Sequence, residues 1–129
     1  MSNGNIITNV GKNLILNRVF TSSPTYTAPT KFRTGTGSNT PAATDTALQT
    51  PVTAAASFLA GYPIIPPNSS LNLVQIRCFL DTTQANGNSL REFGVFNTDG
   101  SPKLFSRCVY TAITKTASVQ VIYAEKEVF

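Results

Sequence analysis

Apolar and polar residues alternate with a period of two through much of the second half of the chain. In the segment 71–80, Val74, Ile76 and Cys78 fall on one face and Arg77 falls on the other. This alternation is typical of a β-strand that buries one face. The same kind of pattern predicts three more strands, at 90–97, 103–111 and 118–129.

The breaks between these strands carry residues that suit tight turns. Asn86-Gly87 and Asp99-Gly100 are pairs that tolerate the positive φ angles of a two-residue hairpin turn. We therefore expect 71–129 to form an antiparallel four-strand meander, in which each strand pairs with the next along the chain.

The final segment, 118–129, differs from the other three because both of its faces are apolar. Val121 and Tyr123 share one face, and Ile122 and Ala124 share the other. This pattern predicts a strand that is covered on both sides.

A different period marks the start of the chain, where apolar residues recur three or four positions apart. The positions concerned are Ile7, Gly11, Leu14, Ile15 and Val19. This spacing predicts an amphipathic helix over 7–20, with Thr8 as its N-cap.

Between the predicted helix and the first predicted strand of the second half, the periodic pattern is lost. Much of 21–70 is rich in proline, threonine and serine, and only the stretch 26–33 alternates enough to predict a strand. Thr46 and Gln49 stand at capping-box spacing, which indicates one helical turn. Because long loops in compact domains are often functional, we expect 21–70 to be an extended arm that lies on another protein.

These elements fit a single domain over 1–129, because 129 residues are enough to bury a core without disulfides or metals. The expected fold is mainly β: an antiparallel β-sandwich or jelly-roll-like domain with the N-terminal amphipathic helix and long extended loops. Charged residues make up only 12% of the chain, about half the usual share. A polar but weakly charged surface is typical of a protein that packs against neighbours.

The net charge is +4, but the basic residues are scattered singly from Lys12 to Lys126. Nucleic-acid-binding domains usually cluster such residues on one face, so we expect no nucleic acid as a partner. No run approaches the roughly 18 apolar residues of a membrane span. The start, MSNGNIITN, lacks the order of a secretory signal. We expect no membrane association, and synthesis in a cytoplasm.

The side chains that most enzymes use are scarce. The sequence has no histidine, which excludes Ser-His-Asp and Cys-His arrangements and the commonest metal ligand. The stretch 97–101, NTDGS, is similar to a calcium loop, but Val95 and Ser106 stand where that loop needs its key carboxylates. Glu125 and Glu127 share a strand face, where a paired-carboxylate site is one interpretation and a solvated, charged sheet edge is the favoured one. We expect no catalytic residue, no metal and no cofactor.

Two cysteines, Cys78 and Cys108, fall within predicted strands. If their strands flank 90–97 on either side, the two residues lie roughly 9–10 Å apart, from the spacing of strands in a sheet. A disulfide requires Cα atoms within about 7 Å. We therefore predict two free, buried thiols.

Three arginines, Arg77, Arg91 and Arg107, lie in the middle of predicted strands beside apolar residues. They form either a solvent-facing polar row or contacts to carboxylates and carbonyls across an interface. With residues of the arm and the C-terminus they make up the expected protein-binding set: Tyr26, Phe32, Arg33, Leu48, Tyr62, Arg77, Arg91, Arg107 and Phe129.

Several short motifs occur in an order that is found in one group of proteins. ITNVGKNLI comes first, GTGSNTPAATDTAL follows, and LREFGVFNTDG precedes an ITKT turn. This order resembles tailed-bacteriophage virion structural proteins, which include small β-rich decoration (cement) proteins and the attachment domains of some tail fibres. The matching positions are Gly35, Gly37, Thr46, Leu48, Glu92, Gly94, Phe96, Asp99 and Gly100.

The resemblance implies a non-enzymatic building block of the virion, made in the host bacterial cytoplasm. We expect a capsid decoration protein that binds the major capsid protein and assembles as a homotrimer. A tail or baseplate component that seats a tail fibre or spike is the alternative. A carbohydrate-binding β-domain is a third interpretation, which the lack of tryptophan disfavours.

Overall fold

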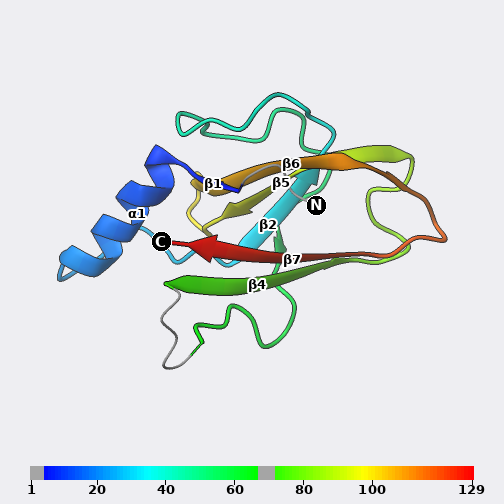
Figure 1. The fold of residues 1–129 in the computed structure, drawn as a ribbon. Helices are drawn as coiled ribbons and strands as arrows, with labels where there is room; N and C mark the ends of the chain where they lie inside the picture. Colours follow the sequence, from blue (N-terminus) through cyan, green and yellow to red (C-terminus); the bar gives the residue numbers. More distant parts are fainter. Residues whose placement is uncertain (1–4, 67–71) are drawn as a thin grey trace.

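The residues that the structure describes, 5–66 and 72–129, form two antiparallel sheets and one short helix (Figure 1). The structure is a computed structural model, and the chain in it is mainly β, as the alternating pattern predicts. Its elements in chain order are β1 (Ile6–Ile7), α1 (Asn9–Phe20), β2 (Lys31–Gly35), β3 (Ala56–Ser57), β4 (Leu73–Leu80), β5 (Asn88–Phe96), β6 (Leu104–Lys115) and β7 (Val121–Val128).

The larger sheet is built around a hairpin, and its strand order is β1-β6-β5-β2-β3. β5 and β6 are consecutive in the chain and pair with Phe93 opposite Cys108 and Val95 opposite Ser106. β2 lies on the other side of β5, where Phe32 is opposite Val95. The hairpin strands therefore occupy the inner positions of this sheet.

β4 and β7 form the second sheet by themselves, with Leu73 opposite Val128 and Leu80 opposite Val121. The expected four-strand meander of 71–129 is therefore wrong: its four strands exist, but only β5 and β6 pair as chain neighbours. The segments before β5 and before β7 carry the chain from one sheet to the other (Figure 1). This arrangement lets the apolar faces of the two sheets cover each other, which a single meander does not.

The two expected hairpin turns have different outcomes. Asp99-Gly100 lies in the loop that joins the paired strands β5 and β6. Asn86-Gly87 lies in the crossover from β4 to β5, where Gly87 has a φ of 84° and Ala85 has a φ of 56°. The pattern correctly places a glycine at a positive φ here, but the turn connects two sheets rather than two paired strands.

Side chains of both sheets contribute to one hydrophobic core. The Phe93 ring of β5 stacks on the Tyr123 ring of β7 with 4.7 Å between centroids, and the rings of Phe32 and Phe93 lie 5.9 Å apart. Cys78 and Cys108 are free and buried in this core. The prediction of free, buried thiols is confirmed, although the two strands belong to different sheets. Burial is the main cause that raises the pKa of each thiol above its ordinary value.

β7 buries only one of its two faces. Val121 and Tyr123 belong to the core, whereas Ile122 is 61% exposed and Ala124 is exposed as well. The expectation that 118–129 is covered on both sides is therefore wrong. In the described ranges, the second face of β7 stays open to solvent.

α1 starts directly after Thr8, as the capping pattern predicts. The Thr8 hydroxyl accepts a hydrogen bond from Gly11 N at 2.9 Å and donates one to the Leu104 carbonyl at 2.6 Å. Gly11 is required because a Cβ at this position would clash with the Phe105 carbonyl group. The helix is shorter than expected, since Ile7 pairs with β6 instead of entering the first turn.

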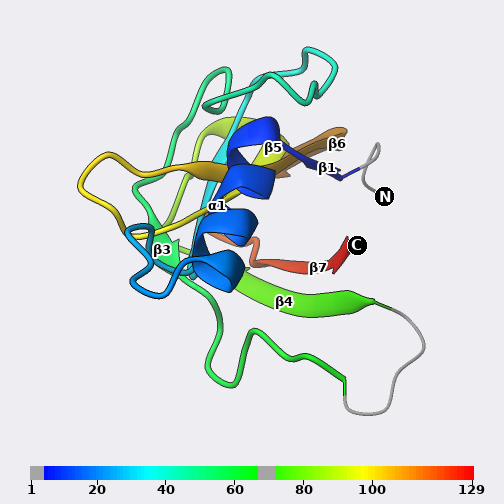
Figure 2. The ribbon, with the colours of Figure 1, turned by 90° about the vertical axis from the view of Figure 1, so that its left-hand side faces the viewer.

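α1 lies across one end of the two sheets (Figure 2). Gly11 and Leu14 are its buried residues, but Val19 is 66% exposed, and Leu16 and Phe20 are exposed too. The expected amphipathic character is therefore not confirmed. The second half of the helix presents apolar side chains to solvent.

Most of the expected arm, 21–70, folds back on its own chain, so its extended, outward-reaching form is wrong for 21–66. β2 and β3 come from this region and pair with each other, and β2 also pairs with β5. The strand expected at 26–33 is found at Lys31–Gly35. The rest of the predicted arm, 67–70, lies outside the described residues.

Candidate functional site

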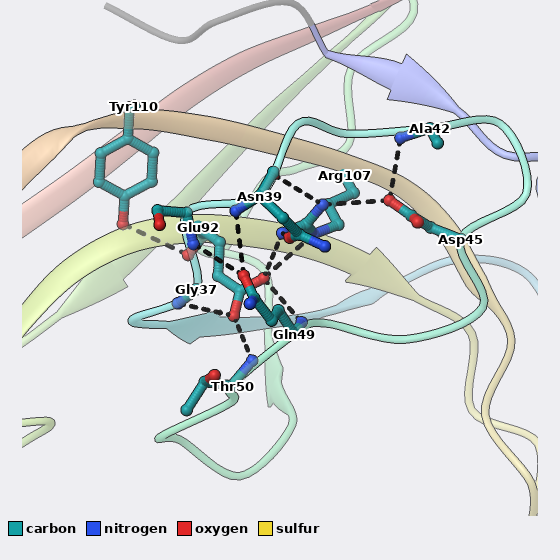
Figure 3. Close-up of polar contacts among 10 residues, drawn as sticks. Gly37, Asn39, Ala42, Asp45, Gln49, Thr50, Glu92, Arg107 and Tyr110 are labelled. Carbon is teal, nitrogen blue, oxygen red and sulfur yellow. Dashed lines mark hydrogen bonds and ion pairs between the residues drawn. The ribbon is translucent and has the colours of Figure 1, made fainter.

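A buried ion pair joins the two hairpin strands of the larger sheet. Glu92 of β5 and Arg107 of β6 are 0% and 1% exposed. The Nη2 and Nε atoms of Arg107 each lie 3.0 Å from Glu92 Oε1, and Nη1 lies 3.1 Å from Asp45 Oδ2 (Figure 3). Because a buried charge is costly unless it is paired and hydrogen-bonded, this cluster is a candidate functional site.

The Glu92 carboxylate also holds the long loop between β2 and β3. It accepts hydrogen bonds from the backbone N–H groups of Gly37, Gln49 and Thr50, at 3.1, 2.9 and 2.7 Å. Figure 3 shows that these groups approach the carboxylate from both branches of the loop. One side chain of β5 thus fixes two distant parts of the loop.

Gln49 and Asn39 complete the attachment of the loop. Gln49 Oε1 accepts hydrogen bonds from the N–H groups of Ser38 and Asn39, at 2.9 and 3.0 Å. The Asn39 carbonyl oxygen accepts one from Arg107 Nη1 at 3.3 Å. The helical turn expected at Thr46 and Gln49 is therefore wrong, because the Gln49 side chain caps the opposite branch of the loop.

Glu92, Arg107 and Asp45 form what we call the clamp, because they attach the loop between β2 and β3 to strands β5 and β6. Each oxygen of Glu92 accepts at least two hydrogen bonds, and Arg107 donates through Nε, Nη1 and Nη2. These groups are used inside the chain, so a ligand would have to break the clamp in order to bind. Arg107 does meet carboxylates and a carbonyl, but within the chain and not across an interface.

Residues of the two stretches GTGSNTPAATDTAL and LREFGVFNTDG, which are far apart in the sequence, meet around the clamp. Gly37 allows the loop to approach Glu92, since a Cβ there would lie 2.6 Å from Glu92 Oε2. Leu48 packs over Gly94, where a Cβ would lie 2.7 Å from a Leu48 methyl group. The motifs therefore describe one local structure that spans β5 and the loop after β2.

Asp99, the acidic residue of the calcium-like stretch 97–101, holds another loop of the chain. Its Oδ1 accepts hydrogen bonds from the backbone N–H and the hydroxyl of Thr27, at 3.1 and 3.0 Å. The backbone hydrogen bond from Thr27 is the largest cause that lowers the pKa of Asp99. Within the described residues, no group of three or more side chains suits a metal ion.

Three residues of the expected protein-binding set belong to the interior. Phe32, Leu48 and Arg107 are 1%, 6% and 1% exposed. The prediction that these three residues contact a partner directly is therefore wrong. Phe32 lies in the main core, Leu48 packs with Phe96 and Arg107 forms the clamp.

The other six residues of that set remain accessible. Tyr26, Arg33 and Tyr62 are half-buried, and Arg77, Arg91 and Phe129 are exposed. The Arg77 guanidinium lies 5.6 Å from the centroid of the Tyr62 ring, and Arg33 Nε donates to the Thr53 carbonyl at 2.8 Å. Arg77 and Arg91 thus fit the solvent-facing polar row, whereas Arg107 does not.

A cleft of about 400 Å³ opens beside α1, at the end of the two sheets. Its walls are almost entirely apolar, and at its mouth Val19, Ile65 and Phe129 are 66%, 74% and 54% exposed. The apolar residues that line it are Leu14, Ile15, Val19, Ala28, Pro29, Phe58, Pro63, Ile65, Val74, Ile76, Val95, Phe105 and Phe129. Of these, only Phe129 belongs to the expected binding set. Ile15 and Val19 were missed because the helical spacing assigns them to a buried face of the helix.

Glu127 of β7 forms part of the wall of this cleft and is 2% exposed. Its Oε1 accepts hydrogen bonds from Ser106 Oγ at 2.7 Å and from Asn5 Nδ2 at 2.8 Å. Among the described residues, Oε2 has no hydrogen-bond partner. Burial raises the pKa of Glu127, and the hydrogen bonds from Ser106 and Asn5 oppose that rise.

Glu125 lies half-buried on the same face of β7, and its Oε1 is 3.8 Å from Cys108 Sγ of β6. Burial, followed by the charge of Glu127, raises the pKa of Glu125. The expected solvated edge is therefore wrong, because both carboxyl groups face the space between the sheets. In the described part of the chain, neither carboxyl group forms an ion pair with a basic side chain.

Comparisons with protein families, with characterised proteins and with solved structures gave no match. Over 5–66 and 72–129, no helix has the length and apolar character that crossing a membrane requires. The described residues thus present two features: a saturated ion-pair clamp, and an apolar cleft with a buried carboxyl group in its wall.

Proposed function

We propose that this chain is a non-enzymatic structural protein of a tailed-bacteriophage virion, and that it decorates the capsid as a cement protein bound to the major capsid protein. Its role is to hold protein surfaces together and so stabilise the shell. The location that follows is the virion, after synthesis in the cytoplasm of the host bacterium.

The observation that carries the binding role is the apolar surface around the cleft beside α1. Val19, Ile65 and Phe129 surround its mouth and are more than half exposed. Contiguous apolar patches on a protein surface usually mark an interaction site. A partner that covers this patch removes it from water, which is favourable by about 25 cal/mol for each Å² of apolar surface.

The assignment to a virion is supported by the resemblance in motif order and by what its residues do. Gly37 and Leu48 come from one motif and Glu92 and Gly94 from another, and in the folded chain Gly37 contacts Glu92 and Leu48 contacts Gly94. Motifs that converge on one local structure are a stronger basis for a resemblance than short matches scattered over a surface.

The proposal includes a finer architecture, a β-sandwich of the jelly-roll kind, and assembly as a homotrimer. The main core, to which both sheets contribute, supports the two-layer arrangement. A trimer suits the local three-fold positions of a capsid shell, where one cement protein bridges several coat subunits.

The abundance of the protein in purified phage particles tests this proposal. Quantitative mass spectrometry should find it at a copy number comparable to that of the major capsid protein, and tailless heads should retain it. Absence of the protein from purified particles would overturn the proposal.

A tail or baseplate location is the second candidate, favoured by the resemblance to tail-fibre attachment domains. In that case the copy number should match that of the tail-fibre protein instead. Tailless heads should then lack the protein completely.

A further inference from the structure

We propose that the cleft beside α1 takes a lysine side chain of the partner protein, with the aliphatic stem along the apolar walls and the ammonium group paired with Glu127. This inference rests on the proposed protein-binding function and adds the chemistry of the contact. It follows from three properties of the cleft: its unpartnered acceptor, its charge and its shape.

The first property is the unpartnered oxygen of Glu127. The residue is 2% exposed, and its Oε2 has no hydrogen-bond partner among the described residues, whereas Oε1 accepts from Ser106 and Asn5. A buried acceptor that has lost its water without gaining a donor is unfavourable. An occupant of the cleft that brings a donor to Oε2 removes this cost.

The second property is the charge of the wall. Glu127 is the acidic residue of the lining, and Glu125, which lies outside the lining, precedes it by two residues on the same face of β7; in the described ranges neither forms an ion pair. Arg107, the buried basic residue nearby, is already paired with Glu92 and Asp45. The occupant that best complements two carboxyl groups is a cation.

Arg18 does not supply that cation. It lies on the lining of the cleft, but its Nη1 donates to the Tyr26 carbonyl oxygen at 2.8 Å, and the described residues show no ion pair between Arg18 and Glu127. The guanidinium is thus held at a backbone carbonyl, and Oε2 of Glu127 stays without a partner among the described residues.

The third property is the shape of the cleft. Leu14, Val74 and Phe105 give it apolar walls, and its volume of about 400 Å³ lies within the range of ligand sites. Lysine combines an aliphatic stem with a compact ammonium group, which needs fewer fixed acceptors than the planar fork of arginine. One unpartnered carboxylate oxygen in the wall of an apolar cleft therefore favours lysine over arginine.

The test uses n-pentylamine as a mimic of the lysine side chain and n-pentanol as a neutral molecule of equal length. Each is titrated into the purified ¹⁵N-labelled protein at constant pH, and binding is followed by amide chemical shifts of Leu14, Val74 and Phe105. We expect the amine to bind at least about tenfold more tightly than the alcohol, from the usual strength of a charge-assisted hydrogen bond.

The matched variants are Glu127→Gln and Glu125→Gln. Both variants replace a glutamate by glutamine on the same face of β7, but only Glu127 lies on the lining of the cleft. Glu127→Gln should reduce the preference for the amine to about twofold or less, whereas Glu125→Gln should keep most of it. If Glu127→Gln does not fold, the ¹³C carboxyl shift of Glu127 in the unchanged protein should respond to the amine and not to the alcohol.

Equal binding of amine and alcohol, binding of neither, or an amine preference that survives Glu127→Gln would each overturn the inference. These results are independent of the proposed function. A protein that is absent from phage particles but still selects the amine contradicts only the virion proposal. A protein that is abundant on capsids but shows no selectivity contradicts only the lysine site.

Discussion

At the scale of single residues, one carboxylate of the larger sheet accepts hydrogen bonds from three backbone N–H groups and from an arginine. Glu92 and Arg107 are 0% and 1% exposed, so water contributes little to the stabilisation of either charge. Removing one partner of a buried pair leaves the other charge uncompensated, which costs more than the pair itself contributes. The clamp therefore makes the fold sensitive to changes at Glu92 and Arg107, although neither is exposed.

We expect Glu92→Ala to lower the free energy of unfolding by about 3–5 kcal/mol, because Arg107 then stays buried without its main partner. Urea denaturation measures this change. The control is Arg91→Ala, at the exposed neighbouring residue, which should change the free energy of unfolding by less than about 0.5 kcal/mol. Similar losses of unfolding free energy in both variants would contradict the stabilising role of the clamp.

The stability of the protein should also depend on pH through Glu127, whose folded-state pKa is raised above its ordinary value of 4.5. A raised pKa means that the folded state binds the proton more tightly than the unfolded state. Its contribution to stability is complete below the ordinary pKa and is lost as the pH rises through the folded-state pKa.

We therefore expect the free energy of unfolding to fall as the pH rises above about 4.5, and to fall less in Glu127→Gln. Part of the decline remains in this variant, since the pKa of Glu125 is raised as well. Urea titrations at a series of pH values measure both slopes. An unchanged slope in Glu127→Gln would show that the carboxyl group is not shielded from solvent.

At the scale of elements, α1 has two halves with different roles. Its first half is fixed by the Thr8 cap, by Gly11 and by Leu14, which is 2% exposed. Its second half carries Val19 and Phe20, which are 66% and 80% exposed. The fold does not need these apolar side chains, so we assign them to the binding surface.

We expect Val19→Glu to weaken binding to capsids at least about tenfold, because it places a charge in an apolar contact. The free energy of unfolding should change by less than about 1 kcal/mol, since Val19 is exposed in the free protein. The control on the same helix is Asn13→Glu, at an exposed residue that is not part of the cleft. Cosedimentation with particles that lack the protein measures binding, and equal effects of the two variants would exclude α1 from the contact.

The strands of the second half could be predicted from the sequence, but most of their partners could not. Alternation identifies 71–80 and 118–129 as strands, because a buried face leaves a period of two. It does not show which strand lies alongside, and the pairing of β4 with β7 joins residues as distant as Leu73 and Val128. The β5–β6 hairpin was predictable because only residues 97–103 separate the two strands, which leaves little choice of partner.

The clamp was harder to predict than the strands for a related reason. Gly37, Gln49 and Thr50 bind Glu92 through their backbone N–H groups, which every residue except proline possesses. The composition of the loop therefore carries no sign of the attachment. Gly35 and Gly37 give a hint, since each permits a close approach to Glu92 that a side chain would prevent.

At the scale of the whole molecule, two sheets are joined mainly by side chains, and each contributes one buried cysteine. Cys78 of β4 and Cys108 of β6 are both 0% exposed. A reagent can reach them only when the sheets separate or the chain unfolds. The thiols therefore report how firmly the two sheets are held together.

We expect both thiols to react with Ellman's reagent at least about a thousandfold more slowly in the native protein than in guanidinium chloride, as the stability of a typical domain implies. The raised pKa of each thiol adds to this protection, because the thiolate is the reactive form. Rapid native reaction of one cysteine and not the other would mean that one sheet opens by itself.

The attachment of the loop between β2 and β3 also constrains the order in which the chain folds. The carboxylate that holds the loop comes from β5 and the guanidinium from β6, so the anchor forms only after these two strands have met. Bringing residues 37 and 92 together before that step would cost loop-closure entropy without the complete set of hydrogen bonds. We therefore expect the β5–β6 hairpin to form before the loop after β2 becomes ordered.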